Sequence, residues 1–218
     1  MSEMITITID GREVTAAAGT TILAAAQGAS IYIPNLCSNE ALAPYGSCRL
    51  CMVEVTDRGR TELVASCMHP VTAGMEVQVN TERVLQGRKL VIELLLTRNP
   101  NDPTLRKIAD ELGVTETRFE IEEKGCILCG KCVRTCRELV GNSAISFQGR
   151  GYGRKVGIPF DEASPDCIGC GACSYICPVH FIPREDKDGI RTIWKTDFQL
   201  SPPFHIPRHI KEFIEKLG

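Results

Sequence analysis

The sequence predicts an α+β fold with a strand-rich N-terminal region, a helical middle and a cysteine-rich C-terminal region. Three observations lead to this prediction. Apolar and polar side chains alternate over residues 5–9, as in a half-buried strand. An apolar stripe with helical spacing runs over residues 81–97. Twelve cysteines form three groups of four within 218 residues, a length that suffices for one large or two small domains.

The composition excludes several classes of protein. With 43% hydrophobic and 24% charged residues, the chain is not expected to be disordered. The formal net charge of -2 implies no general polyanion-binding surface, so no nucleic-acid partner is expected. The longest apolar run, residues 90–96, is interrupted by Glu93 and is much shorter than the roughly 18 residues of a membrane helix. Because the N-terminus also lacks a secretion pattern, we predict a cytoplasmic protein with no direct membrane span.

Residues 1–80 are expected to form a small strand-rich domain. Asp10-Gly11 predicts a hairpin turn after the first strand, and Thr20 or Thr21 can cap a short helix. Three later segments are predicted strands: 51–56, 61–65 and 75–79. Strands, a helix and further strands in this order match the β-grasp ferredoxin arrangement, in which a cluster-binding loop follows the helix.

Residues 81–117 are predicted to form a helical connector. Thr81 can cap a helix that runs to about Thr97. Asp102 as N-cap and Pro103 at the first helical position then start a second helix. The expected role of this pair is simple packing between the two cysteine-rich domains.

Residues 118–185 are expected to form a second cysteine-rich domain, in which a cysteine loop, a short helix and an apolar strand such as 144–147 are imperfectly repeated. The glycine-rich segment 149–154 lacks the lysine and the strand-to-helix setting of a phosphate loop, so a hairpin or insertion is expected there. In the tail, residues 186–218, Pro207 opens an amphipathic helix. This helix either covers its own domain or docks a partner subunit.

Every cysteine belongs to one of three groups. These are Cys37, Cys48, Cys51 and Cys67, spaced C-x10-C-x2-C-x15-C; Cys126, Cys129, Cys132 and Cys136, spaced C-x2-C-x2-C-x3-C; and Cys167, Cys170, Cys173 and Cys177, with that same spacing and followed by Pro178. A reducing compartment disfavours six structural disulfides in a chain of this size. Four thiolates suit zinc or an iron–sulfur cluster, so the groups indicate metal centres.

The second and third groups have the spacing typical of bacterial ferredoxins with two [4Fe-4S] clusters. Structural zinc would instead use two close pairs separated by a longer loop. In the ferredoxin pattern, the fourth cysteine of each run ligates the other cluster. We therefore expect two ligand sets: Cys126, Cys129, Cys132 and Cys177 for one cluster, and Cys167, Cys170, Cys173 and Cys136 for the other. Gly130, Gly169 and Gly171 should let backbone amides approach the cluster sulfurs.

The N-terminal group departs from the plant-type C-x4-C-x2-C spacing, because its first gap is ten residues. Its central C-x2-C runs directly into a predicted strand, and we expect the four thiolates to hold one [2Fe-2S] cluster. Zinc stays open as an alternative on spacing alone. The cysteine sets are complete without histidine, so the four histidines are expected to be structural or surface residues: His69, His180, His205 and His209. No catalytic residue is predicted.

On these residues, the chain resembles the small iron–sulfur subunit of NAD-linked hydrogenase diaphorase modules. The same layout occurs at the N-terminus of the large iron–sulfur subunit of respiratory complex I and of [FeFe] hydrogenases. The resemblance covers most of the chain. It is carried by the three cysteine groups and by four segments: 90–96, 138–147, 150–152 and 167–173.

The resemblance implies an electron-transfer subunit. It would relay electrons between a flavin- and NAD(P)-binding diaphorase subunit and a hydrogenase or other terminal oxidoreductase subunit. The resemblance also allows a soluble ferredoxin as a partner and an electron-bifurcating assembly. Two alternatives stay open: the iron–sulfur subunit of another oxidoreductase, such as a formate dehydrogenase or a fumarate or succinate enzyme, and a non-redox zinc scaffold.

One departure from the family pattern concerns the helical connector. The family usually carries an additional [4Fe-4S] cluster, bound by one histidine and three cysteines, just after the helix at 81–97. Asn99 stands about where that histidine would be, and residues 99–125 contain no cysteine. We therefore expect this additional cluster to be absent. Because no cysteine follows Cys177, an [FeFe] active-site domain is not expected either.

Overall fold

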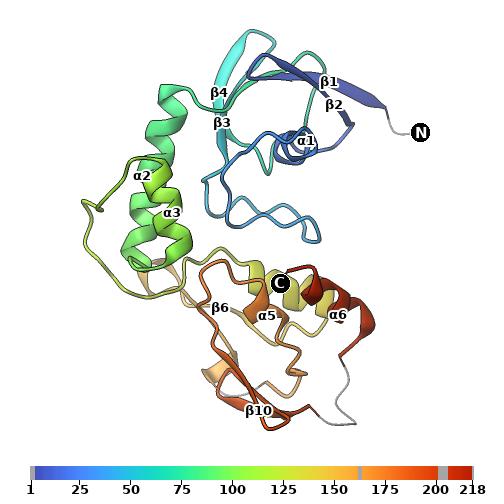
Figure 1. Ribbon diagram of the computed structural model, residues 1–218, viewed down its shortest axis with the longest axis vertical. Coiled ribbons are helices and arrows are strands. Elements are labelled where there is room, and N and C mark those ends of the chain that lie inside the picture. Colours follow the sequence, from blue (N-terminus) through green and yellow to red (C-terminus); the bar gives the residue numbers. More distant parts are fainter. Residues whose placement is uncertain (1–2, 162–163, 201–205, 218) are drawn as a thin grey trace. The chain divides into compact units, whose positions relative to one another are not determined.

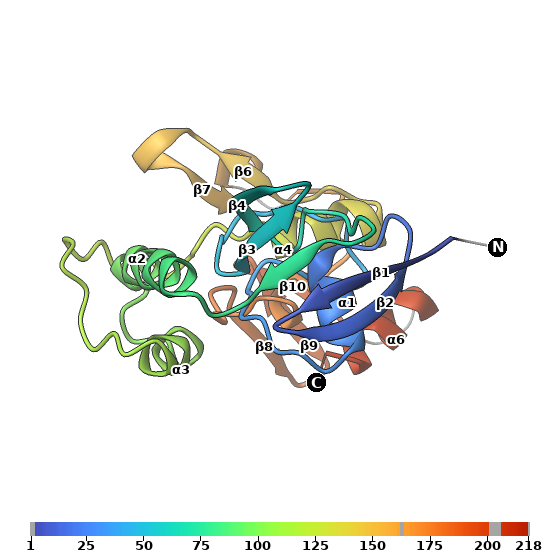
Figure 2. The ribbon, with the colours of Figure 1, turned by 90° about the horizontal axis from the view of Figure 1, so that it is seen from above.

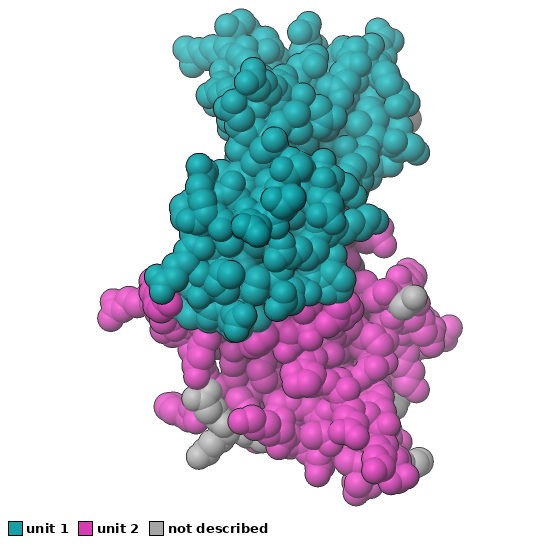
Figure 3. Space-filling view, turned by 60° about the vertical axis from the view of Figure 1, so that its left-hand side comes forward, with its two compact units in different colours: residues 1–38, 44–127 teal, residues 39–43, 128–218 magenta. Residues whose placement is uncertain are grey.

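The structure is a computed structural model that describes residues 3–161, 164–200 and 206–217 (Figure 1). Its chain divides into two units, which are coloured separately in Figure 3. Unit 1 comprises Met1–Ser38 and Pro44–Ile127, and unit 2 comprises Asn39–Ala43 and Leu128–Gly218. Unit 1 contains the first predicted cysteine group together with Cys126, and unit 2 contains the other seven cysteines.

Unit 1 contains a five-stranded mixed sheet with the strand order β2-β1-β5-β3-β4. The strands are β1 (Met4–Ile9), β2 (Arg12–Ala17), β3 (Met52–Asp57), β4 (Arg60–Ala65) and β5 (Glu76–Gln78). β1 and β5 pair in parallel, and the other neighbours are antiparallel. Strands β1, β3, β4 and β5 overlap segments predicted to be strands, and β2 follows the predicted turn at Asp10-Gly11, because alternation and turn residues are local signals.

Helix α1 (Ile22–Gly28) covers the apolar face of this sheet. Alternate residues of a strand point to the same face, so Ile7 and its partner Val14 are both buried, whereas Thr6 is exposed. The helix begins at Thr21, whose hydroxyl accepts a hydrogen bond from the Ala24 amide at 3.3 Å. Figure 2 shows α1 alongside β1 and β2. The chain then enters the long loop that carries the first two cysteines.

Two helices complete unit 1 and pack against each other: α2 (Glu82–Arg98) and α3 (Pro103–Glu111). The Thr81 hydroxyl caps α2 by accepting from the Val84 amide at 3.3 Å. The Asp102 carboxylate caps α3, and Pro103 occupies its first turn. Both predicted helix starts are therefore confirmed.

Unit 2 contains two short helices and a hairpin next to the remaining cysteines. Helix α4 (Lys131–Arg134) continues into the π-helical turn η1 (Thr135–Val140), and α5 (Ala172–Tyr175) packs against α4. Strands β6 (Ser146–Gln148) and β7 (Lys155–Gly157) pair around the glycine-rich segment, which holds the 3₁₀ turn η2 (Gly151–Gly153). A second such turn, η3 (Pro159–Asp161), follows. The predicted hairpin is thus present.

The region after the last cysteine forms a three-stranded antiparallel sheet that was not predicted. Its strands β8 (Arg184–Lys187), β9 (Ile190–Ile193) and β10 (Thr196–Gln199) lie in the order β10-β9-β8. Two-residue turns join them at Asp188-Gly189 and Trp194-Lys195, and all four residues have positive φ. Positive φ at both central positions is typical of tight hairpin turns whose twist matches that of the strands.

Helix α6 (Arg208–Glu215) follows the predicted opening at Pro207. Its Ile210 is fully buried and packs with Cys170 and Ala172. The helix therefore covers its own unit, which is one of the two roles expected for the tail. The Ser201-Pro-Pro203 segment and His205 lie outside the described residues. Within the described ranges, no helix combines the length and the apolar character needed to cross a membrane.

Candidate metal centres

The N-terminal cysteines are gathered by the loop after α1 and by the hairpin β3–β4. Cys37 and Cys48 lie on the loop, Cys51 immediately precedes β3, and Cys67 lies two residues after β4. Met52 pairs with Ala65, so the antiparallel register places Cys51 and Cys67 at the same end of the hairpin. All four cysteines are buried, with at most 6% of each exposed.

The four thiols contact one another. The Cys48 amide donates to the Cys37 sulfur at 3.4 Å. Hydrogen bonds from the Cys48 and Cys67 thiols lower the pKa of Cys37, and the Cys67 thiol also lowers the pKa of Cys51. Because the Cys48 and Cys67 thiols donate these hydrogen bonds, their pKa values are raised, and burial raises them further. Four buried sulfurs that share protons in this way form a converged soft donor set, which suits a thiophilic metal centre.

Two buried polar side chains hold the backbone beside this set. The Ser66 hydroxyl donates to the Cys51 carbonyl at 2.7 Å. Arg88, only 2% exposed, donates to the Met52 carbonyl at 2.7 Å and to Asn80 Oδ1 at 3.2 Å. Burial lowers the pKa of Arg88, and attraction to Cys51 opposes that shift. A buried cation therefore lies near the cysteines, where it can offset negative charge.

In unit 2, one small apolar pocket is lined by four cysteines: Cys136, Cys167, Cys170 and Cys173. Cys136 lies on η1, and the other three belong to the following cysteine run. Among the apolar side chains that line the pocket are Ile145, Ile193 and Trp194. The structure thus brings the fourth cysteine of one run to the first three cysteines of the other run.

Burial governs the protonation of this second set. It raises the pKa of Cys167 and of Cys170, and it raises that of Cys173 to about 12. The Gly169 and Ala172 amides act against the rise at Cys167 and Cys170, respectively, because they donate to the sulfurs. Thiolates in so apolar a pocket need a compensating cation, which a metal centre supplies.

The third set is positioned by the starts and ends of short helices. Cys132 lies on α4, Cys129 immediately precedes its N-cap residue Gly130, and Cys177 follows α5. All three are buried, and the Cys177 sulfur accepts from the Phe181 amide at 3.3 Å. Gly130 and Gly171, the N-caps of α4 and α5, both have the left-handed φ that glycine adopts freely.

Cys126 lies at the end of unit 1, half-buried and only three residues before Cys129 in the chain. Arg98 Nε donates to the Cys126 carbonyl at 2.7 Å, and the side-chain Nδ2 of Asn99 donates to the Gly125 carbonyl at 3.0 Å. Asn99 therefore anchors the backbone that leads into the cysteine loop.

Sequence reasoning missed Arg191, Trp194 and Phe198, which lie on or beside β9 and β10. Asp188-Gly189 is typical of a hairpin turn and could have predicted the β8–β9 pair. The charged residues of β8 have low strand propensity, however, so the sequence pattern did not indicate a strand there. Among the described residues, no three His, Cys, Asp or Glu side chains are grouped as a single-ion site.

The comparisons with known families agree with this geometry. Residues 2–82 match the family model for a 2Fe-2S iron-sulfur cluster binding domain, and residues 119–183 match that for a 4Fe-4S dicluster domain. The chain is therefore an iron–sulfur protein with one domain of each kind.

Individual relatives narrow the class of iron–sulfur protein to which the chain belongs. The chain is 35% identical to the NADP-reducing hydrogenase subunit HndD of Solidesulfovibrio fructosivorans, over 92% of this chain and 38% of that protein. It is 32% identical to the NADPH-Fe(3+) oxidoreductase subunit alpha of Geobacter sulfurreducens, over 81% of this chain and 24% of that protein. A solved NAD+-reducing [NiFe]-hydrogenase in the H2-reduced state matches with a TM-score of 0.63 at 30% identity, over 71% of this chain and 75% of that one.

The chain belongs to the family of iron–sulfur subunits of NAD(P)-linked hydrogenases and complex I-like oxidoreductases. The family resemblance predicted from the sequence is confirmed. The chain spans well under half the length of the curated relatives named above.

Proposed function

We propose that the twelve cysteines hold three clusters. Cys37, Cys48, Cys51 and Cys67 bind one [2Fe-2S] cluster. Two [4Fe-4S] clusters are bound by Cys126, Cys129, Cys132 and Cys177, and by Cys167, Cys170, Cys173 and Cys136. The observation that carries the proposal is the pocket that Cys136 shares with Cys167, Cys170 and Cys173. Such an exchange of the fourth ligand is typical of two-cluster ferredoxins, and paired-cysteine zinc sites do not require it.

We further propose that the N-terminal domain is a β-grasp ferredoxin domain and that the dicluster domain is ferredoxin-like. The mixed sheet with α1 on one face, followed by the cysteine loop, supports the first assignment. The paired loop-and-helix repeats that contain α4 and α5 support the second. The domain boundaries proposed are 1–80, 81–117, 118–185 and 186–218.

In this proposal the chain relays electrons between a flavin- and NAD(P)-binding diaphorase subunit and a hydrogenase or related terminal subunit. When bound, each cluster accepts and releases one electron. The protein's own residues bury the sulfurs, exclude water and donate amide hydrogen bonds to them, which are the means by which a protein tunes such centres. We place the protein in the cytoplasm, because twelve cysteines in metal-ligand spacing suit a reducing compartment.

Anaerobic reconstitution tests the cluster assignment. The proposal expects about ten irons per chain, two from a [2Fe-2S] and four from each cubane. Cys136→Ser should lose about four of them and one cubane signal in electron paramagnetic resonance (EPR), without loss of the [2Fe-2S] signal. Ser174→Ala is the matched control, because it removes only a hydroxyl that donates to the Ile182 carbonyl and should retain all three signals.

Zinc in place of iron, or full iron content in Cys136→Ser, would contradict the cluster assignment. The relay is tested separately by purifying the native complex. It should contain a flavoprotein with a nucleotide-binding fold, whereas a complex containing only a molybdenum-type or quinone-linked partner would favour the alternative oxidoreductases.

A further inference from the structure

Strands β8–β10, residues 184–199, form a sheet that lies against the loop 167–173. The dicluster family match ends at residue 183, so this sheet is outside the part of the chain that the match explains. Arg191 and Phe198 contact the loop, and Trp194 lines the pocket that holds its cysteines.

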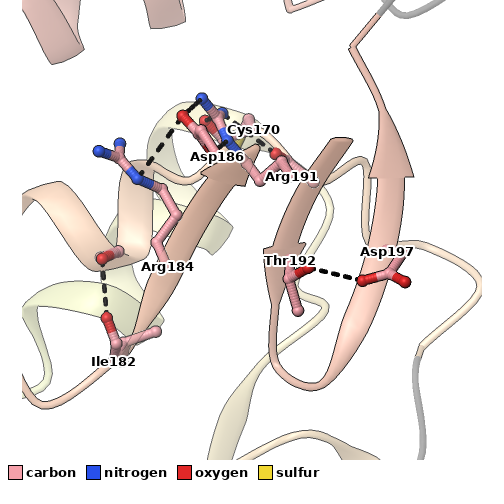
Figure 4. A network of polar contacts seen from close by, with 9 residues as sticks. Cys170, Ile182, Arg184, Asp186, Arg191, Thr192 and Asp197 are labelled. Carbon is pink, nitrogen blue, oxygen red and sulfur yellow. Dashed lines mark hydrogen bonds and ion pairs between the residues drawn. The ribbon is translucent and has the colours of Figure 1, made fainter. Parts of the chain in front are cut away.

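Arg191 is 7% exposed and donates hydrogen bonds to the backbone of the loop (Figure 4). Its Nη1 donates to the Cys170 carbonyl at 2.7 Å and to the Gly169 carbonyl at 3.3 Å. Its Nε and Nη2 each bind one oxygen of Asp186 at 2.8 Å, a bidentate pair that fixes the guanidinium plane. Arg184 lies 3.9 Å from the same carboxylate, so the three side chains together leave one net positive charge.

The two carbonyls that Arg191 holds determine where the neighbouring amides point. A trans peptide directs its N–H opposite to its C=O. The amides of Cys170 and Gly171 are therefore turned away from the guanidinium. Arg191 does not line the cysteine pocket, whereas Gly169, Cys170 and Gly171 do. The hydrogen bonds from Arg191 thus leave these two amides free to face the sulfurs in the pocket.

Trp194 approaches the same pocket from the turn between β9 and β10. Its indole Nε1 is buried and has no hydrogen-bond partner among the described residues. Its side chain lines the same pocket as Cys173. A buried N–H donor without a full partner is costly. A thiolate or sulfide in the pocket would satisfy it.

Phe198 covers the loop backbone at Gly169. A Cβ built on Gly169 would be 2.3 Å from Phe198 Cγ, so the ring lies directly on the loop backbone. Ile193, 1% exposed, lines the pocket beside Trp194. Together these side chains keep water away from the second cysteine set.

We propose that the β8–β10 sheet raises the reduction potential of the cubane bound by Cys136, Cys167, Cys170 and Cys173, with Arg191 as a positioning residue and Trp194 as a hydrogen-bond donor. This inference rests on the proposed ligand assignment. Reduction adds one electron to an anionic cluster, so a nearby positive charge and N–H donors stabilise the reduced form more than the oxidised form. Removing either group should make this cubane harder to reduce.

The test is an EPR-monitored redox titration of the full reconstituted chain. Trp194→Phe keeps an aromatic ring but removes the N–H, and Arg191→Gln removes the charge. Each should lower the one-electron reduction equilibrium constant of one cubane about tenfold, which corresponds to about 59 mV. The other cubane and the [2Fe-2S] centre should not shift. Lys195→Gln is the matched control, since it removes an equal charge from an exposed position on the same turn.

The outcomes separate this inference from the cluster assignment. If the wild-type chain fails to form two cubanes, the assignment itself is wrong. If both cubanes form and Trp194→Phe shifts neither potential more than Lys195→Gln does, the inference is overturned. Should Arg191→Gln lose the cubane through misfolding, which far-UV circular dichroism would show, Trp194→Phe alone decides the result.

Discussion

Replacing Ser66 by alanine would test whether a single buried hydroxyl secures the hairpin end that joins Cys51 to Cys67. Ser66 is fully buried, and its Oγ donates to the Cys51 carbonyl at 2.7 Å. A typical hydrogen bond contributes about 0.5–1.5 kcal/mol net, whereas an acceptor left unsatisfied costs about 1–3 kcal/mol. The Cys51 carbonyl keeps the Ser66 amide as a donor at 3.0 Å. We therefore expect Ser66→Ala to lose about 1 kcal/mol.

The assay is urea unfolding of the metal-free chain, followed by far-UV circular dichroism. Thr61→Val is the control, because its hydroxyl contacts that of Thr56 at 2.8 Å at an exposed position and its loss should cost less than about 0.5 kcal/mol. Trp194, the one tryptophan, belongs to unit 2, so its fluorescence transition should not move. A loss no larger than the control's, or one above about 3 kcal/mol, would refute the reasoning about the retained amide donor.

Three further predictions concern other parts of the chain. Gly169→Ala places a methyl group against Phe198 and should remove about four irons per reconstituted chain. The control Gly189→Ala, which is also at positive φ but has open space around it, should retain these irons. Equal iron loss in both variants would contradict the steric argument. Asp102→Ala removes the cap of α3 and should lower the unfolding free energy by about 1 kcal/mol in urea titration, and no change would show that the cap is dispensable. The hydrogen-bonded guanidinium of Arg191 lowers the pKa of Asp186, so the stabilising effect of this carboxylate should be complete above pH 3.8 and fade as the pH falls below that value. Acid titration should show the stability difference between Asp186→Asn and wild type closing at low pH. A stability difference that stays constant with pH would contradict this prediction.

The parts of the fold that depend on neighbouring residues were predictable. Thr81 and Asp102 cap their helices through side chains that reach amides three residues ahead, which is a contact within one turn. The proximity of Cys136 to the later cysteine run was also predictable, because the spacing of the cysteines restricts which sulfurs one loop can bring together. Cys136 accordingly lies in the pocket of the later run.

The β8–β10 sheet could not be derived in the same way. Arg191 reads as a solvated charge in the sequence, and its burial depends on Asp186 and on two carbonyls of a loop more than twenty residues earlier. Trp194 adopts a positive φ, which a bulky residue rarely does and which no local pattern announces. Such features arise from packing between segments, and short-range pattern analysis does not detect them.

The most direct test of the central claim is native mass spectrometry of the anaerobically reconstituted chain. The account predicts one dominant species whose added mass equals one [2Fe-2S] and two [4Fe-4S] clusters, and loss of a single cubane increment in Cys136→Ser. A chain that carries zinc ions, or that saturates with a single cubane, would contradict it.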